Sequence, residues 1–405
     1  MTEDGWLNAP ADVLARLERL LRDFVACSVA GRVTETARIA ADYASAQHPG
    51  DDATALFDGR RLSTTGAAFA NGVLANALDF DDGHRLVKGH PGACVIPAAL
   101  AVAESAQASS EELRAAILIG YETAIRAGIA LHARSAEYHA SGAWGALGAA
   151  AAAARLLGLD EPRTRHALGL AGYHAPIAPI MRSVAEPAMT KDACGWGSFV
   201  GVSSALLAAR GFTALSSEPV APEPTLGERW HLLDVYVKRF PCCRWSHPAI
   251  AAALELRKRL GPEHIGQIRI GTFAGAAALA RGHPTTTEEA QYSLVWPVAV
   301  AVAHGRFDVE HVLPPAFGDR AARRLLDVVT VEVEPELEAE FPGRRRSAVA
   351  IGTSDGDRHE SGPTEAPGEP DDPRWEEIVD AKAALYPDGG LFASLGLLPI
   401  SSAIS

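Results

Sequence analysis

Four segments of the chain carry side chains of the kinds that move protons or hold carboxylates. The first spans residues 78–84 and continues to His90, with three carboxylates inside four residues and two histidines after them. Such acids repel one another unless cations lie nearby, and they could bind a metal if other segments added ligands. A polar turn that ends a helix explains the same residues without a function. Asp79, His84 and His90 are the candidates here.

Two further segments each offer one residue at the start of a helix of small residues. His139 precedes the alanine-rich run 142–157, where the helix N-terminus favours a neutral imidazole or a bound anion. The simpler interpretation is that His139 only caps the helix. Lys191 precedes the small-residue run 195–209 and would be costly to bury without a partner. Asp192 or a substrate carboxylate could be that partner.

The fourth segment, residues 236–248, gathers positive charge beside thiols, an indole and a histidine. Its apolar side chains prefer burial, which argues against a solvated surface loop. Lys238, Arg244 and His247 are candidate substrate ligands, because arginine in particular binds carboxylates in bidentate fashion. Cys243 is a candidate acid or base if neighbouring cations lower the pKa of its thiol, and otherwise forms part of the pocket wall.

Together these residues predict proton transfer beside a carboxylate. A carbanion-like centre needs an acid or base that titrates near neutral pH, and fixed positive charge for the developing enolate. His90 and His139 are the candidate acid and base. The lysines supply charge, and Lys191 could itself become a base if burial lowers its pKa. Asp79 is expected to orient a histidine or a lysine.

The elements that must position these residues change character along the chain. Apolar residues recur at helical spacing from residue 10 to 209, interrupted by an expected loop at 51–64. Beyond residue 211, alternating segments predict strands at 264–274, 328–333 and 346–353, with a helix at 288–304 and a loop at 354–373. We therefore expect a mainly α protein with a smaller α+β domain. Its parts are a large all-helical domain (1–235), an α+β lid domain (236–385) and a short C-terminal return (386–405).

Composition narrows the class of protein. A chain of 405 residues is long enough for two cores, and its formal charge of −13 argues against nucleic-acid or membrane-surface partners. Five cysteines, two of them adjacent, do not suggest a disulfide framework, and no zinc-like spacing occurs. The acidic N-terminus and the short apolar runs predict a cytoplasmic protein. No metal site is expected.

Five motifs resemble those of a known family. They are ALDFDDGH, HASGAWGALGAAAAAARLLGL, AMTKDACGWGSFVGVSSALLAARGFTA, VKRFPCCRWSHPAI and EAQYSLVWPVAVAVAHGR, in this order. Together they resemble the MmgE/PrpD family, which includes 2-methylcitrate dehydratase, cis-aconitate decarboxylase and iminodisuccinate epimerase. The resemblance covers about residues 14–385. It implies a homodimer with an all-α domain, an α+β lid domain, an active site between them and no cofactor.

By motif, five residues are similar to conserved polar positions of that family: Asp79, His90, His139, Lys191 and Lys238. Three positions depart from the cis-aconitate decarboxylases. Gly83 stands where they have threonine, Cys243 where they have histidine, and Trp296, a candidate pocket residue, where they have tyrosine. These departures argue against decarboxylation of cis-aconitate.

The resemblance therefore favours a cofactor-independent lyase, of the dehydratase type, that acts on a small carboxylate. Such chemistry needs one base and one acid. An epimerase, which needs two bases on opposite faces of one carbon, is the first alternative. A catalytically lapsed relative that serves as a binding or scaffold protein is the second.

Overall fold

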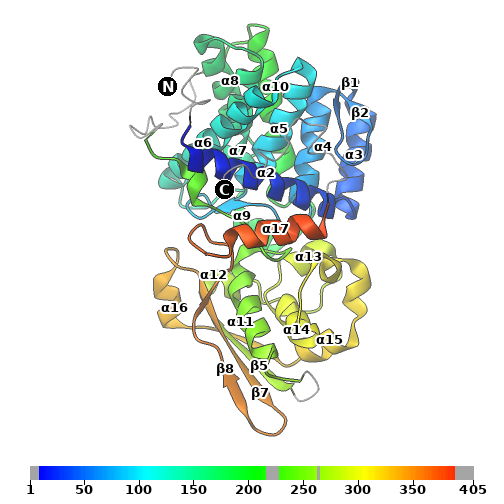
Figure 1. Ribbon diagram of the computed structural model, residues 1–405, viewed down its shortest axis with the longest axis vertical. Helices are drawn as coiled ribbons and strands as arrows, with labels where there is room; N and C mark the ends of the chain where they lie inside the picture. Colours follow the sequence, from blue (N-terminus) through cyan, green and yellow to red (C-terminus); the bar gives the residue numbers. More distant parts are fainter. Residues whose placement is uncertain (1–8, 216–227, 262–264, 388–405) are drawn as a thin grey trace, which may run out of the picture.

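Helices make up almost all of the first domain in the computed structural model, which describes residues 9–215, 228–261 and 265–387. Figure 1 shows these helices stacked above a smaller second domain. Their bounds are α2 Ala11–Gly31, α3 Glu35–Gln47, α4 Thr64–Asn76, α5 Pro91–Ala106, α6 Ser110–Arg134, α7 Gly142–Leu156, α8 Glu161–His174, α9 Ile180–Ala185 and α10 Cys194–Ala209.

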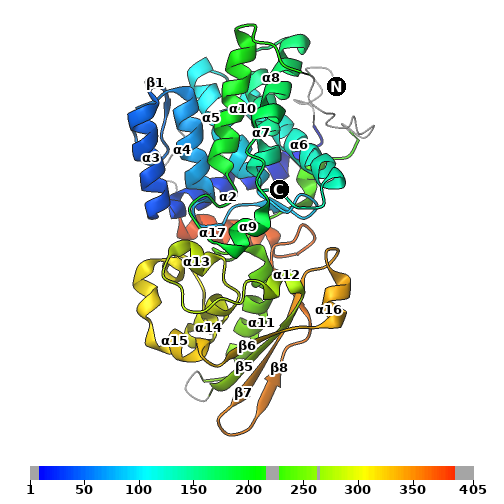
Figure 2. The same ribbon diagram turned by 180° about the vertical axis from the view of Figure 1, so that it is seen from behind.

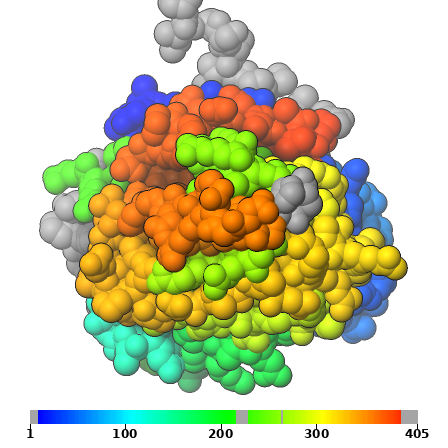
Figure 3. Space-filling view, turned by 90° about the horizontal axis from the view of Figure 1, so that it is seen from below, coloured from blue at the N-terminus to red at the C-terminus, as the bar shows by residue number. Residues whose placement is uncertain are grey.

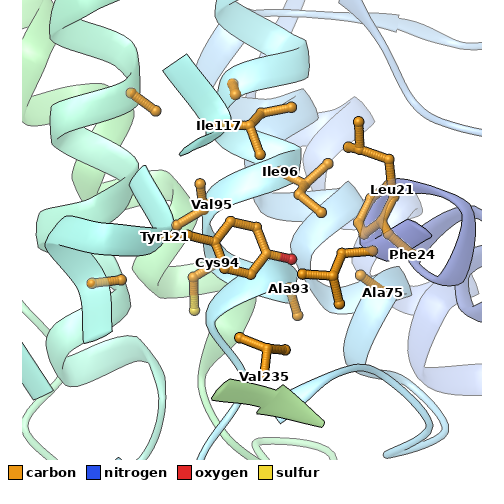
Figure 4. Close-up of a cluster of buried hydrophobic side chains, with 14 of the residues drawn as sticks. Leu21, Phe24, Ala75, Ala93, Cys94, Val95, Ile96, Ile117, Tyr121 and Val235 are labelled. Atoms are coloured by element: carbon orange, nitrogen blue, oxygen red, sulfur yellow. The ribbon is translucent and has the colours of Figure 1, made fainter. Parts of the chain in front are cut away.

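Local sequence explains where these helices begin and how closely they pack. Ser109 accepts a hydrogen bond from the Glu112 N–H and so caps α6, whose first turn is acidic. The alanine-rich α7 lies buried among α5, α6 and α10. Figure 4 shows the adjoining core, where Tyr121 of α6 lies among the apolar side chains of α5 and α2 and above Val235.

The second domain is a five-stranded mixed sheet with helices packed against it. Strand order is β6-β5-β7-β8, with β9 also paired to β7; β5 and β6 run parallel and the other pairs are antiparallel. The strands are β5 Ile265–Thr272, β6 Val329–Val333, β7 Arg346–Thr353, β8 Arg358–Glu360 and β9 Thr364–Glu365. The main helices are α11 His247–Arg257, α12 Ala274–Ala277, α13 Thr287–Gln291, α14 Val295–His304, α15 Arg320–Leu326 and α16 Pro335–Glu340.

The last described helix, α17 (Trp375–Leu385), joins the two domains. It follows the sheet in sequence but packs along α2, where Asp380 pairs with Arg19 and Arg22. Figures 1 and 2 show α17 at the boundary between the domains. From below, the second domain hides most of the helical one, which is visible only at the rim (Figure 3). The predicted return at 386–405 falls almost wholly outside the described residues.

The predicted fold class is confirmed, with corrections in the loops. Residues 51–64, expected to be a loop, contribute to a small antiparallel ladder of β1 (Pro49–Thr54) and β2 (Arg61–Leu62). The expected loop 354–373 contains β8 and β9. Short strands held by two or three residue pairs carry too little alternation to be seen in a sequence. Within the described parts of the chain, no helix combines the length and apolar character needed to cross a membrane.

Candidate active site

Asp79 and Lys238 form a buried ion pair across the domain boundary. The Lys238 Nζ lies 2.5 Å from Asp79 Oδ1 and 2.9 Å from its carbonyl oxygen, and the side chains are 1% and 3% exposed. Burial by itself raises the pKa of Asp79, but Lys238, His90 and Lys191 together outweigh it and hold that pKa well below its usual range. Burial lowers the pKa of Lys238, but Asp79 and Asp81 together outweigh it, so the pKa is raised. Both groups are therefore charged at neutral pH.

His90 lies against the same carboxylate. Its Nε2 is 3.3 Å from Asp79 Oδ1, and its Nδ1 is 2.7 Å from the Asp82 carbonyl and 3.3 Å from Asp81 Oδ2. Burial lowers the pKa of His90, but Asp81, Asp192 and Asp79 together raise it to about 9. His90 is therefore an imidazolium at neutral pH, with Nδ1–H donated to a carbonyl and Nε2–H directed at carboxylates.

Lys191 lies near these residues, and its pKa is shifted in the opposite direction to that of His90. Its Nζ donates to Gln291 Oε1 at 2.6 Å, and the Gln291 amide is itself oriented by a bond to the Ala77 carbonyl. Burial lowers the pKa of Lys191 and outweighs the neighbouring carboxylates Asp79 and Asp81. The site therefore holds a histidine with a raised pKa and a lysine with a lowered one.

Asp192 connects the remaining polar groups. Ser141 donates to its Oδ1 at 3.1 Å, Tyr292 donates to its Oδ2 at 3.1 Å, and His90 Nε2 lies 3.9 Å from that oxygen. The sequence suggested Asp192 as the partner of Lys191. This is wrong, because the lysine ammonium bonds to Gln291 instead.

Backbone strain marks the same residues. Asp79, Lys191 and Ala193 have φ values of +50°, +42° and +53°, a region that residues other than glycine rarely adopt. Such conformations persist only where the surroundings hold them, and they cluster at functional sites. The 188–193 turn also approaches α7 closely, since a Cβ on Gly142 would lie 2.4 Å from the Ala193 carbonyl. Small residues at this contact therefore bring Asp192 to Ser141.

A second buried ion pair supports the acidic loop from behind. Lys382 of α17 contacts Asp23 Oδ1 at 2.6 Å and the Phe80 carbonyl at 2.9 Å. Phe80 lies between Asp79 and Asp81, so α17 helps to set the position of both carboxylates. Nothing in the sequence connects residues 302 positions apart, and this support was not predicted.

The structure brings together Asp79, His90, Lys191 and Lys238, but it places His139 at the edge. The His139 ring stacks on His132 with centroids 6.1 Å apart, and the His139 backbone N–H donates to His132 Nε2. The ring Nδ1 of His139 is buried and has no hydrogen-bond partner among the described residues. This segment bonds to the central group through Ser141 and Gly142, which both donate to Asp192.

The other predicted residues receive different surroundings. Burial raises the pKa of Cys243 to about 12, which argues against a thiolate acid or base and leaves it as part of the wall. The Arg244 guanidinium bonds to Glu369 and to the Val237, Ala366 and Pro367 carbonyls, so it already has protein partners. Trp296 is fully buried in the second core and donates to the His311 carbonyl.

Two more predicted ligands, His84 and His247, are also buried away from the central hydrogen bonds. His247 Nε2 lies 3.2 Å from the Cys242 carbonyl, and burial holds its pKa well below the usual range. Burial, with His231 and nearby arginines, lowers the pKa of His84 to about 3. Arg244, His247 and Trp296 each have protein contacts in the structure, and their substrate-binding roles stay predictions.

Charge argues against a metal at the centre. Ligand atoms of Asp79, His90 and Asp192 lie within 4.8 Å of one another, close enough to hold an ion. However, Asp79 already meets the Lys238 ammonium, and an imidazolium is not a metal ligand. The other such group, His84, His231 and Asp234, lies among arginines that repel a cation.

Two models of known protein domains match most of the chain. The model of the MmgE/PrpD N-terminal domain matches residues 6–236, and that of the MmgE/PrpD C-terminal domain matches residues 240–386. The chain belongs to the MmgE/PrpD family. The junction between the two family domains falls at residues 237–239, so Lys238 stands between them, and Gln291 and Tyr292 come from the C-terminal one.

Curated relatives within the family are distant in sequence. The chain is 25% identical to the cis-aconitate decarboxylase-like protein oryM of Aspergillus oryzae over 395 residues, which are 86% of this chain and 81% of the relative. It is 28% identical to cis-aconitate decarboxylase of Homo sapiens over 358 residues, 80% of this chain and 73% of the relative. For cis-aconitate decarboxylase of Mus musculus the identity is 27%, with 81% and 73% covered.

Proposed function

We propose that this protein is a lyase that removes water from, or adds it to, a small di- or tricarboxylate at the carbon beside a carboxylate. The observation that carries the proposal is the pair of opposed pKa shifts. His90 is kept protonated and Lys191 is pushed towards its neutral form. Two titratable groups whose surroundings push their pKa values apart supply the acid and the base that an elimination needs.

In the proposed elimination, the Lys191 amine takes the proton from the carbon beside the carboxylate. The Lys238 ammonium, oriented by Asp79, stabilises the negative charge that develops on that carboxylate. As the C–O bond at the next carbon breaks, His90 gives its Nε2 proton to the departing hydroxyl, which leaves as water. A C=C bond forms, and the hydration direction runs through the same steps in reverse.

Decarboxylation is a second candidate, because the curated relatives are named cis-aconitate decarboxylases. Loss of CO₂ leaves a carbanion that needs one proton, which His90 can donate. No base is needed to begin this reaction. The two reactions therefore make different demands on Lys191.

The test is incubation with cis-aconitate and with 2-methylcitrate in D₂O, followed by NMR and CO₂ measurement. Hydro-lyase activity interconverts alkene and alcohol with no CO₂ released, whereas decarboxylation releases one CO₂ for each deuterium gained. For the hydro-lyase, Lys191→Met should lower kcat by about 10²–10⁴-fold, the usual contribution of a general base. Lys258→Met is the matched control, since this exposed lysine pairs with Glu255 at the surface. Carbon dioxide release, with Lys191→Met nearly as active as wild type, would replace the hydro-lyase with the decarboxylase.

A further inference from the structure

Arg345 is a buried guanidinium without a carboxylate partner among the described residues. The residue is 6% exposed and directly precedes β7. Its Nη2 donates to the Arg85 carbonyl at 2.9 Å, and its Nε has no hydrogen-bond partner. A buried charge that lacks a counter-ion is costly, so such a group is normally found with an anion.

The nearest acid cannot serve Arg345 alone. Glu369 already accepts from Arg244 at 2.8 Å and from Arg85 at 3.3 Å. Burial raises the pKa of Glu369, but the three arginines together lower it below its usual range. Arg244 has the largest effect of the three. Three guanidinium groups therefore face one carboxylate, which leaves positive charge in excess at this place.

Tyr236 adds a second polar group without a partner. It is 2% exposed, and its hydroxyl makes no hydrogen bond to any residue that the structure describes. The ring lies over Gly83, where a Cβ would come within 2.4 Å of the hydroxyl oxygen, and the Arg244 guanidinium stacks on it at 4.5 Å. Burial raises the pKa of this phenol despite the cations nearby, so it remains a neutral hydrogen-bond donor.

Tyr236 also links Arg345 to the catalytic centre. Tyr236 lies in β4 (Val235–Tyr236), two residues before Lys238. It is paired with Gly83 of β3 (Gly83–His84), and Gly83 follows Asp79 by four residues. Among charged neighbours, Lys238 and then Arg345 act most strongly on the phenol, and Tyr236 acts most strongly on Arg345. Tyr236 thus precedes Lys238 by two residues along the chain and interacts electrostatically with Arg345.

We infer that Arg345 and Tyr236 form an anion subsite for a second carboxylate of the substrate, beyond the carboxylate that Lys238 stabilises. An arginine binds a carboxylate through two parallel hydrogen bonds, and the phenol adds a third donor. The subsite selects substrates with two or more carboxylates over those with one. Its assignment to substrate rests on the proposed function; its affinity for a carboxylate does not.

Calorimetric titration with tricarballylate tests the subsite without turnover, because this tricarboxylate has neither a hydroxyl nor a double bond. Arg345→Met should weaken binding by about 10- to 100-fold, the effect of losing a charged hydrogen-bond partner. Arg345→Lys should recover part of the affinity, and Tyr236→Phe should lose less than Arg345→Met. Arg346→Met is the matched control: this neighbour pairs with Glu340 at the surface and should bind as wild type.

Stability separates binding from a structural role. Removing an unpaired buried charge should leave the Tm of ligand-free Arg345→Met equal to or above that of wild type, whereas loss of a structural ion pair would lower it. Wild-type affinity for tricarballylate in Arg345→Met would overturn the inference. The inference would also be overturned if Arg345→Met lost as much affinity for propionate, which has one carboxylate, as for tricarballylate. A higher affinity of the subsite for inorganic phosphate than for tricarballylate would overturn it as well. Binding that depends on Arg345, with no turnover of any substrate, would refute the proposed function and leave the subsite standing.

Discussion

The raised pKa of His90 should be visible in the pH dependence of stability. Its folded-state pKa of about 9, against the ordinary histidine pKa of 6.5, corresponds to about 3 kcal/mol of stabilisation. Because the folded pKa lies above the unfolded one, this contribution is fully present below pH 6.5 and is lost as the pH rises through 9. The carboxylates around the ring are its source, so a neutral side chain cannot reproduce it.

The measurement is urea unfolding of wild type and His90→Gln from pH 6 to pH 10. The difference in unfolding free energy between them should shrink by about 3 kcal/mol across this range, with most of the change between pH 6.5 and 9. Asp81→Asn removes the strongest of the carboxylates that raise the pKa and should move the change to lower pH. The same pKa should appear as the alkaline limb of kcat/KM, because the free enzyme needs His90 as an acid. A difference that is independent of pH would refute the charged imidazole and, with it, the assigned acid.

Two further predictions concern the support of the acidic loop. Lys382→Met leaves Asp23 buried without its cation, and should lower the free energy of unfolding by about 3–5 kcal/mol in urea titrations; a loss under 1 kcal/mol would contradict the ion pair. Gly83→Ala places a Cβ 2.4 Å from the Tyr236 hydroxyl and should cost about 1–3 kcal/mol by overpacking. In the Tyr236→Ala background that cost should disappear, and equal destabilisation in both backgrounds would show that the ring is not the obstacle.

Most of the helical domain could be predicted because its signals are local. The run of alanines at 149–154 favours helix wherever the chain folds, and Ser109 followed by two glutamates starts α6 as expected. The candidate residues Asp79, His90, Lys191 and Lys238 were found because charged residues beside apolar motifs are costly to bury without a function. The structure brings these four residues together, whereas His139, also expected at the active site, lies at the edge of the group.

The partners of these residues could not be predicted, because they depend on contacts far apart in the sequence. Lys191 has Asp192 beside it but bonds to Gln291, 100 positions away. Arg345 stands in a run of three arginines, where it reads as part of a solvated surface, yet it is the buried one. Burial of a single residue in such a run follows from the packing of the turn before β7, which periodicity does not report.

Two buried ion pairs hold the same short loop from different sides. Lys238 reaches Asp79 from the domain junction, and Lys382 reaches the Phe80 carbonyl and Asp23 from α17. Buried pairs add little stability over apolar packing, but breaking one is costly, so they favour a single arrangement of the groups they join. Asp79 and Asp81, which flank Phe80, help to keep His90 protonated. Contacts from the domain junction and from α17 thus help to position the carboxylates that keep His90 protonated, although Lys238 itself acts to lower the pKa of His90.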